Sequence, residues 1–319
     1  MGKEGVSLPR ALTYGLLFFV MIVWGLNVIA IKIVVEHFPP LLITSLRIGL
    51  AGIVVLMILI FQKNFRAMSK KEWLYTIAGG LLGMVSNQSL LAAGLSNTSA
   101  SNAALILALV PLTTAVLAMI FLGERLTFFR LIGIVLALIG IAFVILEGSG
   151  GLSGISIGAA YVFGAMFSQA FSFIWINKAT ETLPPRQATA IMLTMGALIM
   201  FLMSLFIHPS GVGKLDHGTL GVWMVFVASS IVATAMGQML YNMAIHQIGA
   251  GASSIFMNLT PFFSLLGSVV FLGESITLAQ IFGFVFIVAG VLFGTGYIDK
   301  KFAGAHQRGS QLLKKHQSG

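Results

Sequence analysis

Residues 111–127, PLTTAVLAMIFLGERLT, recur later in the chain as residues 261–277, PFFSLLGSVVFLGESIT. Both copies begin with a proline, and both reach Phe-Leu-Gly-Glu ten residues later, at a constant offset of 150 residues. A duplication of this kind indicates a fold built from two equivalent halves. The same offset relates Gln88, Leu90, Ala100, Leu109, Gly133 and Gly140 to Gln238, Leu240, Ala250, Leu259, Gly283 and Gly290.

The composition predicts a protein that lies in a lipid bilayer. Hydrophobic residues make up 58% of the 319 residues, and charged residues make up only 8%. Soluble domains carry about 25% charged residues, so this chain has too few charges to cover a surface exposed to water. It has no cysteine, which excludes disulfides, thiolate metal sites and cysteine nucleophiles.

Ten segments of the chain are long and apolar enough to be membrane-spanning helices, which need about 20 residues each. Prolines, glycines and charged residues separate these segments. An open sheet would leave unpaired backbone groups in lipid, and the segments are longer than the strands of a membrane barrel. The predicted spans are 11–32, 40–62, 72–94, 99–122, 128–147, 155–177, 186–207, 219–245, 250–272 and 278–298.

The lysines and arginines between the spans predict the orientation, because these residues concentrate on the cytoplasmic side of membranes. With a cytoplasmic N-terminus, 15 of them fall on the inner side and only Lys32 and Lys214 on the outer side. We therefore expect a multi-pass protein of the cell membrane with both termini in the cytoplasm. The first apolar segment has features of a secretory signal, but it is long enough to be an uncleaved first span. The net charge of +9 forms no patch suited to nucleic acid.

Each half contains five predicted spans, and an odd number makes the second half enter the bilayer from the opposite side. Inverted halves are the architecture of many secondary transporters. The predicted fold is an all-α membrane protein of ten transmembrane helices in two inverted five-helix repeats. The repeats cover residues 12–147 and 155–297, and residues 298–319 form a basic cytoplasmic tail.

Three motifs follow one another along the chain. They are W-G-x-N with a following lysine, a proline pair with a following arginine, and the duplicated proline with its Gly-Glu helix end. Their residues before the duplicated part are Trp24, Gly25, Asn27, Lys32, Pro39, Pro40 and Arg47. In this order, and over both halves, they resemble the EamA branch of the drug/metabolite transporter superfamily. The resemblance implies ten helices, an inverted repeat and a central cavity lined mainly by helices 1, 3, 4, 6, 8 and 9. Known members export amino acids, metabolites or drugs, or take up nutrients.

Polar and aromatic side chains inside the spans are the candidates for a solute site, because polar groups at membrane depth usually face the bundle interior or a cavity. Gln88 and Gln238 are repeat mates and are expected to face each other, and Tyr241 shares a helix face with Gln238. Hydrogen bonding between helices is an equal alternative for the amides, and an interfacial anchor is the alternative for Trp175. The second half has no clear counterpart of Trp24, so we expect an asymmetric cavity. The candidates are Trp24, Asn27, Asn87, Gln88, Asn102, Gln169, Trp175, Gln238, Tyr241, Asn242 and Asn258.

Charged residues and prolines within the spans could also take part in transport. Arg47 could attract a carboxylate or phosphate, although a structural pairing is favoured. Lys32, at the predicted outer end of the first span, is either a gate residue or a rim charge. Pro111 and Pro261 each remove a backbone hydrogen bond in mid-span, so we expect them to shape the cavity and act as hinges.

The acidic residues and motifs argue against enzyme chemistry. The chain has no H-E-x-x-H, G-x-S-x-G or Walker sequence and no carboxylate pair in mid-span. Glu124 and Glu274 are repeat mates at helix ends, where a hydrogen bond to a helix end or loop is favoured over a proton site. We therefore expect that the protein is not an enzyme and uses no metal or other cofactor.

The predicted function is that of a secondary transporter, an exporter of small organic metabolites such as amino-acid- or drug-like solutes, working by alternating access. A membrane-embedded enzyme acting on lipid, or a non-transporting scaffold, is the alternative. The expected partners are a small-molecule solute and the lipid bilayer, without nucleic acid, and a homodimer is left open.

Overall fold

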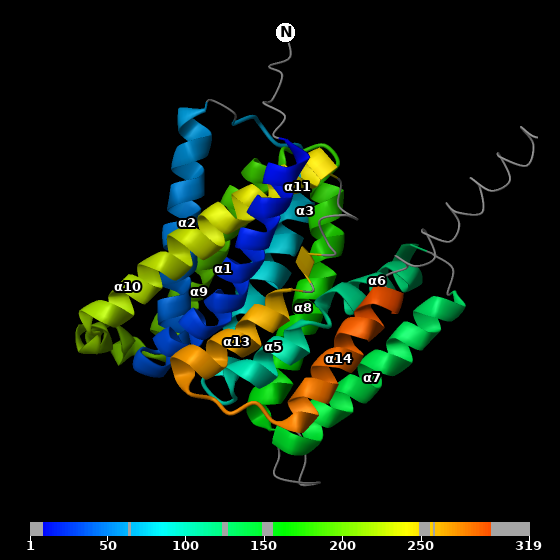
Figure 1. Cartoon of the computed structure of the whole chain (residues 1–319). Coiled ribbons are helices and arrows are strands. Elements are labelled where there is room, and N and C mark those ends of the chain that lie inside the picture. Colours follow the sequence, from blue (N-terminus) through cyan, green and yellow to red (C-terminus); the bar gives the residue numbers. More distant parts are fainter. Residues whose placement is uncertain are drawn as a thin grey trace, which may run out of the picture.

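The computed structural model describes residues 9–294 apart from 63–64, 123–126, 149–155, 249–255 and 258, and all regular structure in this part of the chain is helical (Figure 1). The first half contains α1 (Arg10–His37), α2 (Pro40–Phe61), α3 (Lys70–Gly80), the π-helix η1 (Leu81–Ser86), α4 (Asn87–Leu95), α5 (Ala100–Leu107), α6 (Val110–Leu122) and α7 (Phe128–Gly148). The second half contains α8 (Ile157–Thr180), α9 (Pro185–Ile207), the 3-10 helix η2 (Pro209–His217), α10 (Leu220–Ala228), the π-helix η3 (Ser229–Met236), α11 (Gly237–Ile248), α13 (Thr260–Leu272) and α14 (Leu278–Gly294). The predicted tail, residues 298–319, lies outside the described residues.

Several of these helices are long and apolar enough to cross a membrane. Six such stretches occur among the described residues: Ala11–His37, Pro40–Phe61, Ala100–Leu117, Ile157–Thr180, Pro185–Ile207 and Leu220–Tyr241. Shorter apolar helices are Phe128–Phe143, Thr260–Leu272 and Leu278–Gly294. The remaining predicted span is the continuous helical segment formed by α3, η1 and α4, which begins with three charged residues. Each predicted span is therefore mostly helical where it is described, and six helical stretches meet the length and composition of a span.

Prolines account for several helix ends. α2 begins at Pro40 and α9 begins at Pro185. A proline fits the first turn of a helix because the N–H groups of that turn have no partner within the helix, so the missing N–H costs no hydrogen bond. The predicted end of the first span at residue 32 was wrong, since α1 continues to His37. No helix-breaking residue follows until the proline pair, and the residue before a proline is disfavoured in helical conformation.

Helices α7 and α14, the last helices of the two halves, pack through glycines and run antiparallel (Figure 1). A Cβ atom on Gly133 would lie 2.6 Å from the carbonyl oxygen of Gly290, and a Cβ atom on Gly140 would lie 2.8 Å from that of Gly283. Gly283 and Gly290 are the repeat mates of Gly133 and Gly140, so the two contacts are equivalent under exchange of the halves. Small residues at such crossings let helix backbones approach closely.

Helices α2 and α9 form a second exchanged pair. A Cβ atom on Gly49 would lie 3.5 Å from Cβ of Ala197, and a Cβ atom on Gly52 would lie 3.0 Å from Cγ2 of Thr194. The offset between the halves is 145 residues here, so these contacts also exchange. In both pairs equivalent helices run antiparallel, and a two-fold axis that exchanges antiparallel helices is perpendicular to them. The helices of one half therefore run opposite to their equivalents in the other half.

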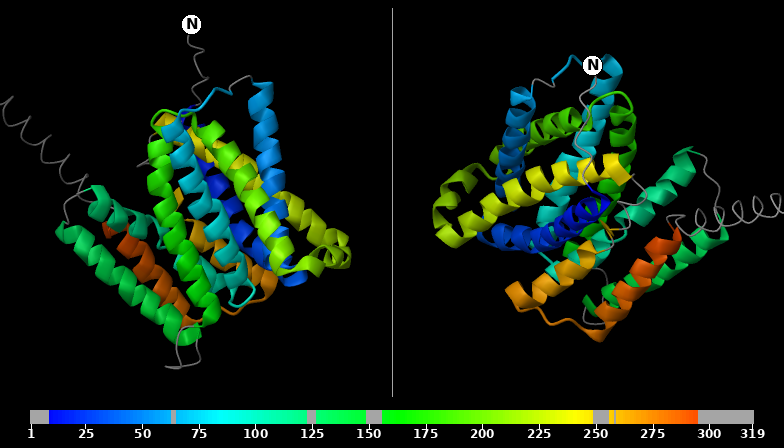
Figure 2. Two further views of the ribbon diagram at one scale, coloured as in Figure 1. Left: turned by 180° about the vertical axis from the view of Figure 1, so that it is seen from behind. Right: turned by 45° about the horizontal axis from the view of Figure 1, so that its top comes forward.

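The first helix of each half packs mainly against the other half. α1 lies between α11 and α13 of the second half, as the right view of Figure 2 shows. α8 makes its main contacts with α3 and α4 of the first half. This crossed packing joins the halves at their centre and brings polar residues of α1 and α8 against the π-helices.

Candidate functional site

The two π-helices occupy matching positions in the halves. η1 interrupts the segment from α3 to α4, and η3 interrupts the segment from α10 to α11. With the offset of 150 residues, η1 corresponds to residues 231–236, which lie within η3. π-Helices are rare and occur frequently at functional sites. Gln88 and Gln238 each follow the end of a π-helix by two residues, so both lie where the helix returns to its normal width.

The W-G-x-N motif of α1 docks onto η3 of the other half. The indole Nε1 of Trp24 donates a hydrogen bond of 3.0 Å to the carbonyl oxygen of Ala233, and the Ser229 hydroxyl donates to Oδ1 of Asn27. The Trp24 ring also lies 5.0 Å from the ring of Tyr241. These contacts fix α1 to the π-helix across the boundary between the halves.

The glycine of the same motif allows a close approach to a second helix. A Cβ atom on Gly25 would lie 2.6 Å from Cβ of Phe263 and 2.8 Å from the carbonyl oxygen of Thr260. Gly237, directly after η3, leaves room for Trp24 in the same way, because a Cβ atom there would lie 2.7 Å from the indole nitrogen. Each defined residue of the motif thus has its own contact with the second half.

Helix α8 repeats this arrangement on η1 with different side chains. The Ser168 hydroxyl donates a hydrogen bond of 2.9 Å to the carbonyl oxygen of Leu82 in η1, and the Asn87 amide donates one of 2.8 Å to the carbonyl oxygen of Ala165. Gln169 is the repeat mate of Trp24, at an offset of 145 residues. Its side chain is half-buried and has no hydrogen-bond partner among the described residues.

Arg47 connects the two π-helical regions. Its side chain is buried, with 3% of its surface exposed. Nη1 donates to the Thr234 hydroxyl of η3 at 3.0 Å, and Nη2 donates to Oε1 of Gln88 at 2.6 Å. Gln88 in turn donates to Oδ1 of Asn87 at 3.1 Å. A chain of hydrogen bonds therefore crosses from η3 of the second half to α2 and α4 of the first half. We define the central polar cluster as Trp24, Asn27, Arg47, Asn87, Gln88 and Thr234.

Several predicted residues lie apart from this cluster and contact other helices. Nζ of Lys32 donates to the carbonyl oxygens of Leu95 and Thr98 at 2.7 and 2.9 Å, so it caps the C-terminal end of α4. Asn102 accepts a hydrogen bond of 2.9 Å from Gln280 of α14. Trp175 lies 5.9 Å from the ring of Tyr75 and beneath the ammonium group of Lys178.

Three further residues predicted for the solute site belong to the second half. Gln238 is half-buried in α11, and its orientation toward Gln88 stays a prediction. Asn258 lies outside the described residues, and so does the side chain of Asn242.

Both predicted hinge prolines follow breaks in their helices. α5 ends at Leu107 and α6 begins at Val110, so Pro111 is the second residue of a new helix. Pro261 is likewise the second residue of α13. A proline fits there because the first turn of a helix needs no N–H donor. Whether these breaks move as hinges stays a prediction.

Glu274 accepts hydrogen bonds from the start of a helix, the role that the sequence favoured over a proton site. Its carboxylate accepts hydrogen bonds from the backbone N–H groups of Ala100 and Ser101 at 2.8 and 3.1 Å, at the start of α5. A negative charge is favourable there because of the helix dipole. Its repeat mate Glu124 lies outside the described residues.

At one end of the bundle, four polar residues join the α2–α3 connection of the first half to the α8–α9 connection of the second. Arg66 donates to the carboxylate of Glu72 and, at 2.7 Å, to the carbonyl oxygen of Thr182. The Thr182 hydroxyl donates to Glu72 at 2.7 Å, and the Gln187 amide donates to the carbonyl oxygen of Arg66 at 2.6 Å. The hydrogen bond to Glu72 raises the pKa of the Arg66 guanidinium, so Arg66 stays charged. We call these four residues the polar knot.

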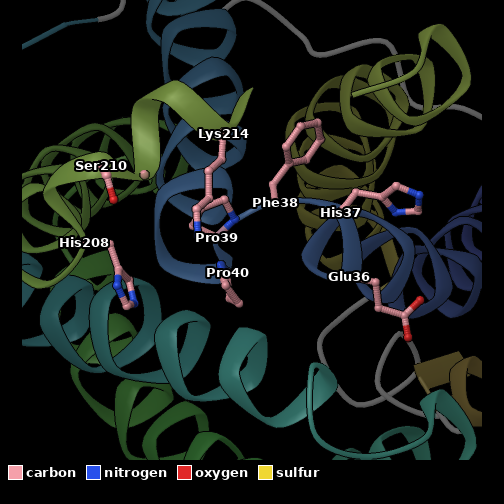
Figure 3. A pocket seen from close by; sticks show the side chains of 9 residues that line it. Glu36, His37, Phe38, Pro39, Pro40, His208, Ser210 and Lys214 are labelled. Carbon is pink, nitrogen blue, oxygen red and sulfur yellow. The ribbon is translucent and has the colours of Figure 1, made fainter. Parts of the chain in front are cut away.

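At the other end of α2, a pocket of about 340 Å³ lies between the α1–α2 connection and the start of η2. Figure 3 shows His208 and Ser210 on one side of it and Glu36, His37 and Phe38 on the other. Among the described residues, no hydrogen bond joins these two connections. The α1–α2 connection corresponds to the α8–α9 connection of the second half, and the α9–α10 connection, which contains η2, corresponds to the α2–α3 connection of the first half. The two connections at the pocket are therefore the repeat equivalents of the two that the polar knot joins.

The geometry of two exchanged halves around a shared polar centre agrees with a comparison against protein families. The profile of the EamA-like transporter family matches residues 11–146 and 156–295. The chain belongs to the EamA-like transporter family. Each match covers one of the two halves of the fold.

Individual EamA-like relatives cover most of the chain. The uncharacterized transporter YyaM of Bacillus subtilis (strain 168) is 31% identical over 271 residues, which are 84% of this chain and 88% of the relative. A protein of Salmonella typhimurium named as a probable amino-acid metabolite efflux pump is 29% identical over 289 residues, 86% of this chain and 92% of the relative. A solved crystal structure, 18% identical, matches with a TM-score of 0.62 over 88% of this chain and 95% of its own, which shows the same fold.

Several residues of this EamA-like protein that hold the site together were missed in the sequence. Thr234 belongs to the central polar cluster, Ser229 contacts it and Ser168 contacts η1, and the polar knot was not predicted at all. Serine and threonine inside apolar segments were a usable signal, because such hydroxyls often hydrogen-bond between helices. The π-helices had no comparable signal.

Proposed function

We propose that the protein is a secondary transporter that exports small organic metabolites, such as amino-acid- or drug-like solutes, by alternating access of two inverted five-helix halves. The observation that carries this proposal is the difference between two equivalent places in the fold. The polar knot closes one of them with hydrogen bonds between the halves, and the other contains a pocket. A pair of halves that exchanged these arrangements would open the opposite end.

The two places lie at opposite ends of one helix. Pro40, the first residue of α2, lines the pocket, and Gln62, directly after α2, accepts a hydrogen bond from Arg186 beside the polar knot. α2 has 22 residues and is therefore about 33 Å long, close to the thickness of a bilayer core. In the proposed cycle, the solute enters from one end while the other is closed.

The central polar cluster is the proposed solute site, together with Gln169, Gln238 and Tyr241. Trp24, Asn27 and Gln88 are half-buried, so each keeps part of its surface accessible. Gln169 supports the proposal further, because its amide has no partner among the described residues. Amide, hydroxyl and indole groups can bind the polar ends of a solute, and the aromatic rings can cover its apolar part.

The direction and orientation rest on separate observations. The Salmonella relative is named as an efflux pump, which supports export. The end with the polar knot carries Arg66, Lys70, Lys71 and Arg186, whereas Lys214 lines the pocket at the other end. This distribution supports a cytoplasmic knot, an outward-facing pocket and cytoplasmic termini in the inner membrane.

Efflux from proteoliposomes tests the proposal. Purified protein is reconstituted into liposomes loaded with a panel of amino acids and drug-like compounds, and the loss of each solute is followed. We expect at least one solute to leave several-fold faster than from liposomes without protein. Gln88→Leu should reduce this flux, whereas Asn97→Leu, a change at an exposed amide that bonds only within its own turn, should not. If no solute of a broad panel leaves faster than from empty liposomes, the proposed function is wrong.

A further inference from the structure

We infer that Arg47 is the binding residue for a single carboxylate group of the transported solute. This inference rests on the proposed function and adds the chemical class of the solute.

Arg47 carries a charge that none of the acidic residues described by the structure pairs with. Among the described residues, the ion pairs are Lys32 with Glu36 and Arg66 with Glu72. Each of the chain's nine acidic residues lies within two residues of a helix end or outside the described helices. Arg47 instead lies seven residues inside α2, which is about 10 Å along the helix. Isolated charges at such depth are costly and mark sites that handle solutes or ions.

The guanidinium of Arg47 has donors to spare. An arginine side chain has five N–H groups, and Arg47 gives only two of them to protein oxygens, those of Thr234 and Gln88. Nε is buried without any hydrogen-bond partner. Both partners of Arg47 are neutral, so they accept hydrogen bonds from the guanidinium but do not balance its positive charge. The planar fork that remains suits a carboxylate, which accepts two parallel hydrogen bonds from one guanidinium.

The number of cations at this depth indicates a solute with one negative charge. Arg47 is the only described lysine or arginine more than five residues from both ends of its helix. The next deepest, Lys32, is engaged by Glu36 and by two carbonyl oxygens at the end of α4. A phosphate group carries close to two charges at neutral pH and would need a second cation. A carboxylate, as in an amino acid or a small organic acid, is balanced by Arg47 alone.

The position of Arg47 would connect binding to the movement of the halves. Its present partners belong to different halves, Gln88 to the first and Thr234 to the second. A carboxylate that took one of these N–H groups would loosen the tie to one half. A solute can shift the equilibrium between two states only through such differential contacts.

The test compares an acid with its neutral analogue. Efflux of a transported amino acid from wild-type proteoliposomes is measured in the presence of increasing amounts of the unlabelled amino acid or of its carboxamide. We expect the carboxamide to compete at least 10-fold more weakly. Arg47→Gln should remove this preference, Arg47→Lys should keep part of it, and Arg186→Gln should leave it unchanged because Arg186 is at the bundle end. If Arg47→Gln fails to fold, the wild-type comparison together with Arg47→Lys decides.

The possible results separate this inference from the proposed function. Equal competition by acid and carboxamide in the wild type, with measurable efflux, would overturn the role of Arg47 and leave the transporter proposal standing. An unchanged preference in Arg47→Gln would do the same. A protein that moves no solute at all would overturn the proposed function and this inference with it.

Discussion

Trp24 of α1 donates its indole N–H to the carbonyl oxygen of Ala233, 3.0 Å away in the π-helix of the other half. Helix α8 makes the matching contact in the opposite sense, from Ser168 to Leu82. Each half therefore stabilises the π-helix of its partner half. A movement of one half relative to the other must carry these contacts along or break them.

Trp24→Phe is expected to destabilise the folded protein and to slow solute transport. The substitution keeps a ring beside Tyr241 but leaves the carbonyl oxygen of buried Ala233 without its donor, which costs about 1–3 kcal/mol. The melting temperature in detergent and the rate of solute efflux should both fall below the wild-type values. Trp73→Phe is the matched control, because Trp73 is 45% exposed on α3. Equal values for the two variants would mean that the contact with η3 contributes nothing.

Gly290→Leu is expected to prevent the correct packing of α7 and α14. A Cβ atom at Gly290 would lie 2.7 Å from the backbone nitrogen of Ala137 and 2.7 Å from the carbonyl oxygen of Gly133, and backbone atoms cannot move aside locally. Overpacking of this kind typically costs 1–3 kcal/mol or more. Size-exclusion chromatography should show loss of the monodisperse peak. Gly15→Leu, where a Cβ atom meets nothing within 4 Å, should behave as wild type, and a monodisperse Gly290→Leu would contradict the packing.

The sequence was sufficient for the positions of the helices but not for their internal form. The duplicated segments and prolines predicted where helices lie, because apolar length and proline act locally. The π-helices were not predictable, since their carbonyl groups are capped by Trp24 and Ser168 from the distant half. The partners of Arg47 were hidden for the same reason, because Thr234 is 187 residues away. Lys32 was placed at a helix end only because the five residues after it were not counted as helical.

Glu72→Gln is expected to open the end closed by the polar knot. The change removes the charge that holds Arg66, so the two connections are joined more weakly. The chain has no cysteine, so a single cysteine at Gln169 can be labelled without background. We expect faster labelling from the cytoplasmic face in the Glu72→Gln background. Glu181→Gln changes an exposed acid at the same end and should leave the rate unchanged; equal rates in both backgrounds would argue that the knot is not a closure.

Single cysteines at Ser210 and Ala67 are expected to report opposite sides of the membrane. Ser210 lines the pocket and Ala67 lies beside the polar knot, and both are exposed. An impermeant maleimide added to whole cells should label Ser210→Cys and not Ala67→Cys until the membrane is broken. The reverse pattern would invert the proposed orientation.

Distances across the two ends of the bundle test alternating access most directly. One variant carries spin labels at Ala67 and Glu181 beside the polar knot, and another carries them at His37 and Ser210 beside the pocket; all four residues are exposed. Pulsed electron paramagnetic resonance measures each pair in proteoliposomes with and without a transported solute. We predict that the solute shifts the two distance distributions in opposite directions, with the knot pair lengthening while the pocket pair shortens. Two pairs that stay fixed, or that lengthen together, would contradict alternating access by exchange of the halves.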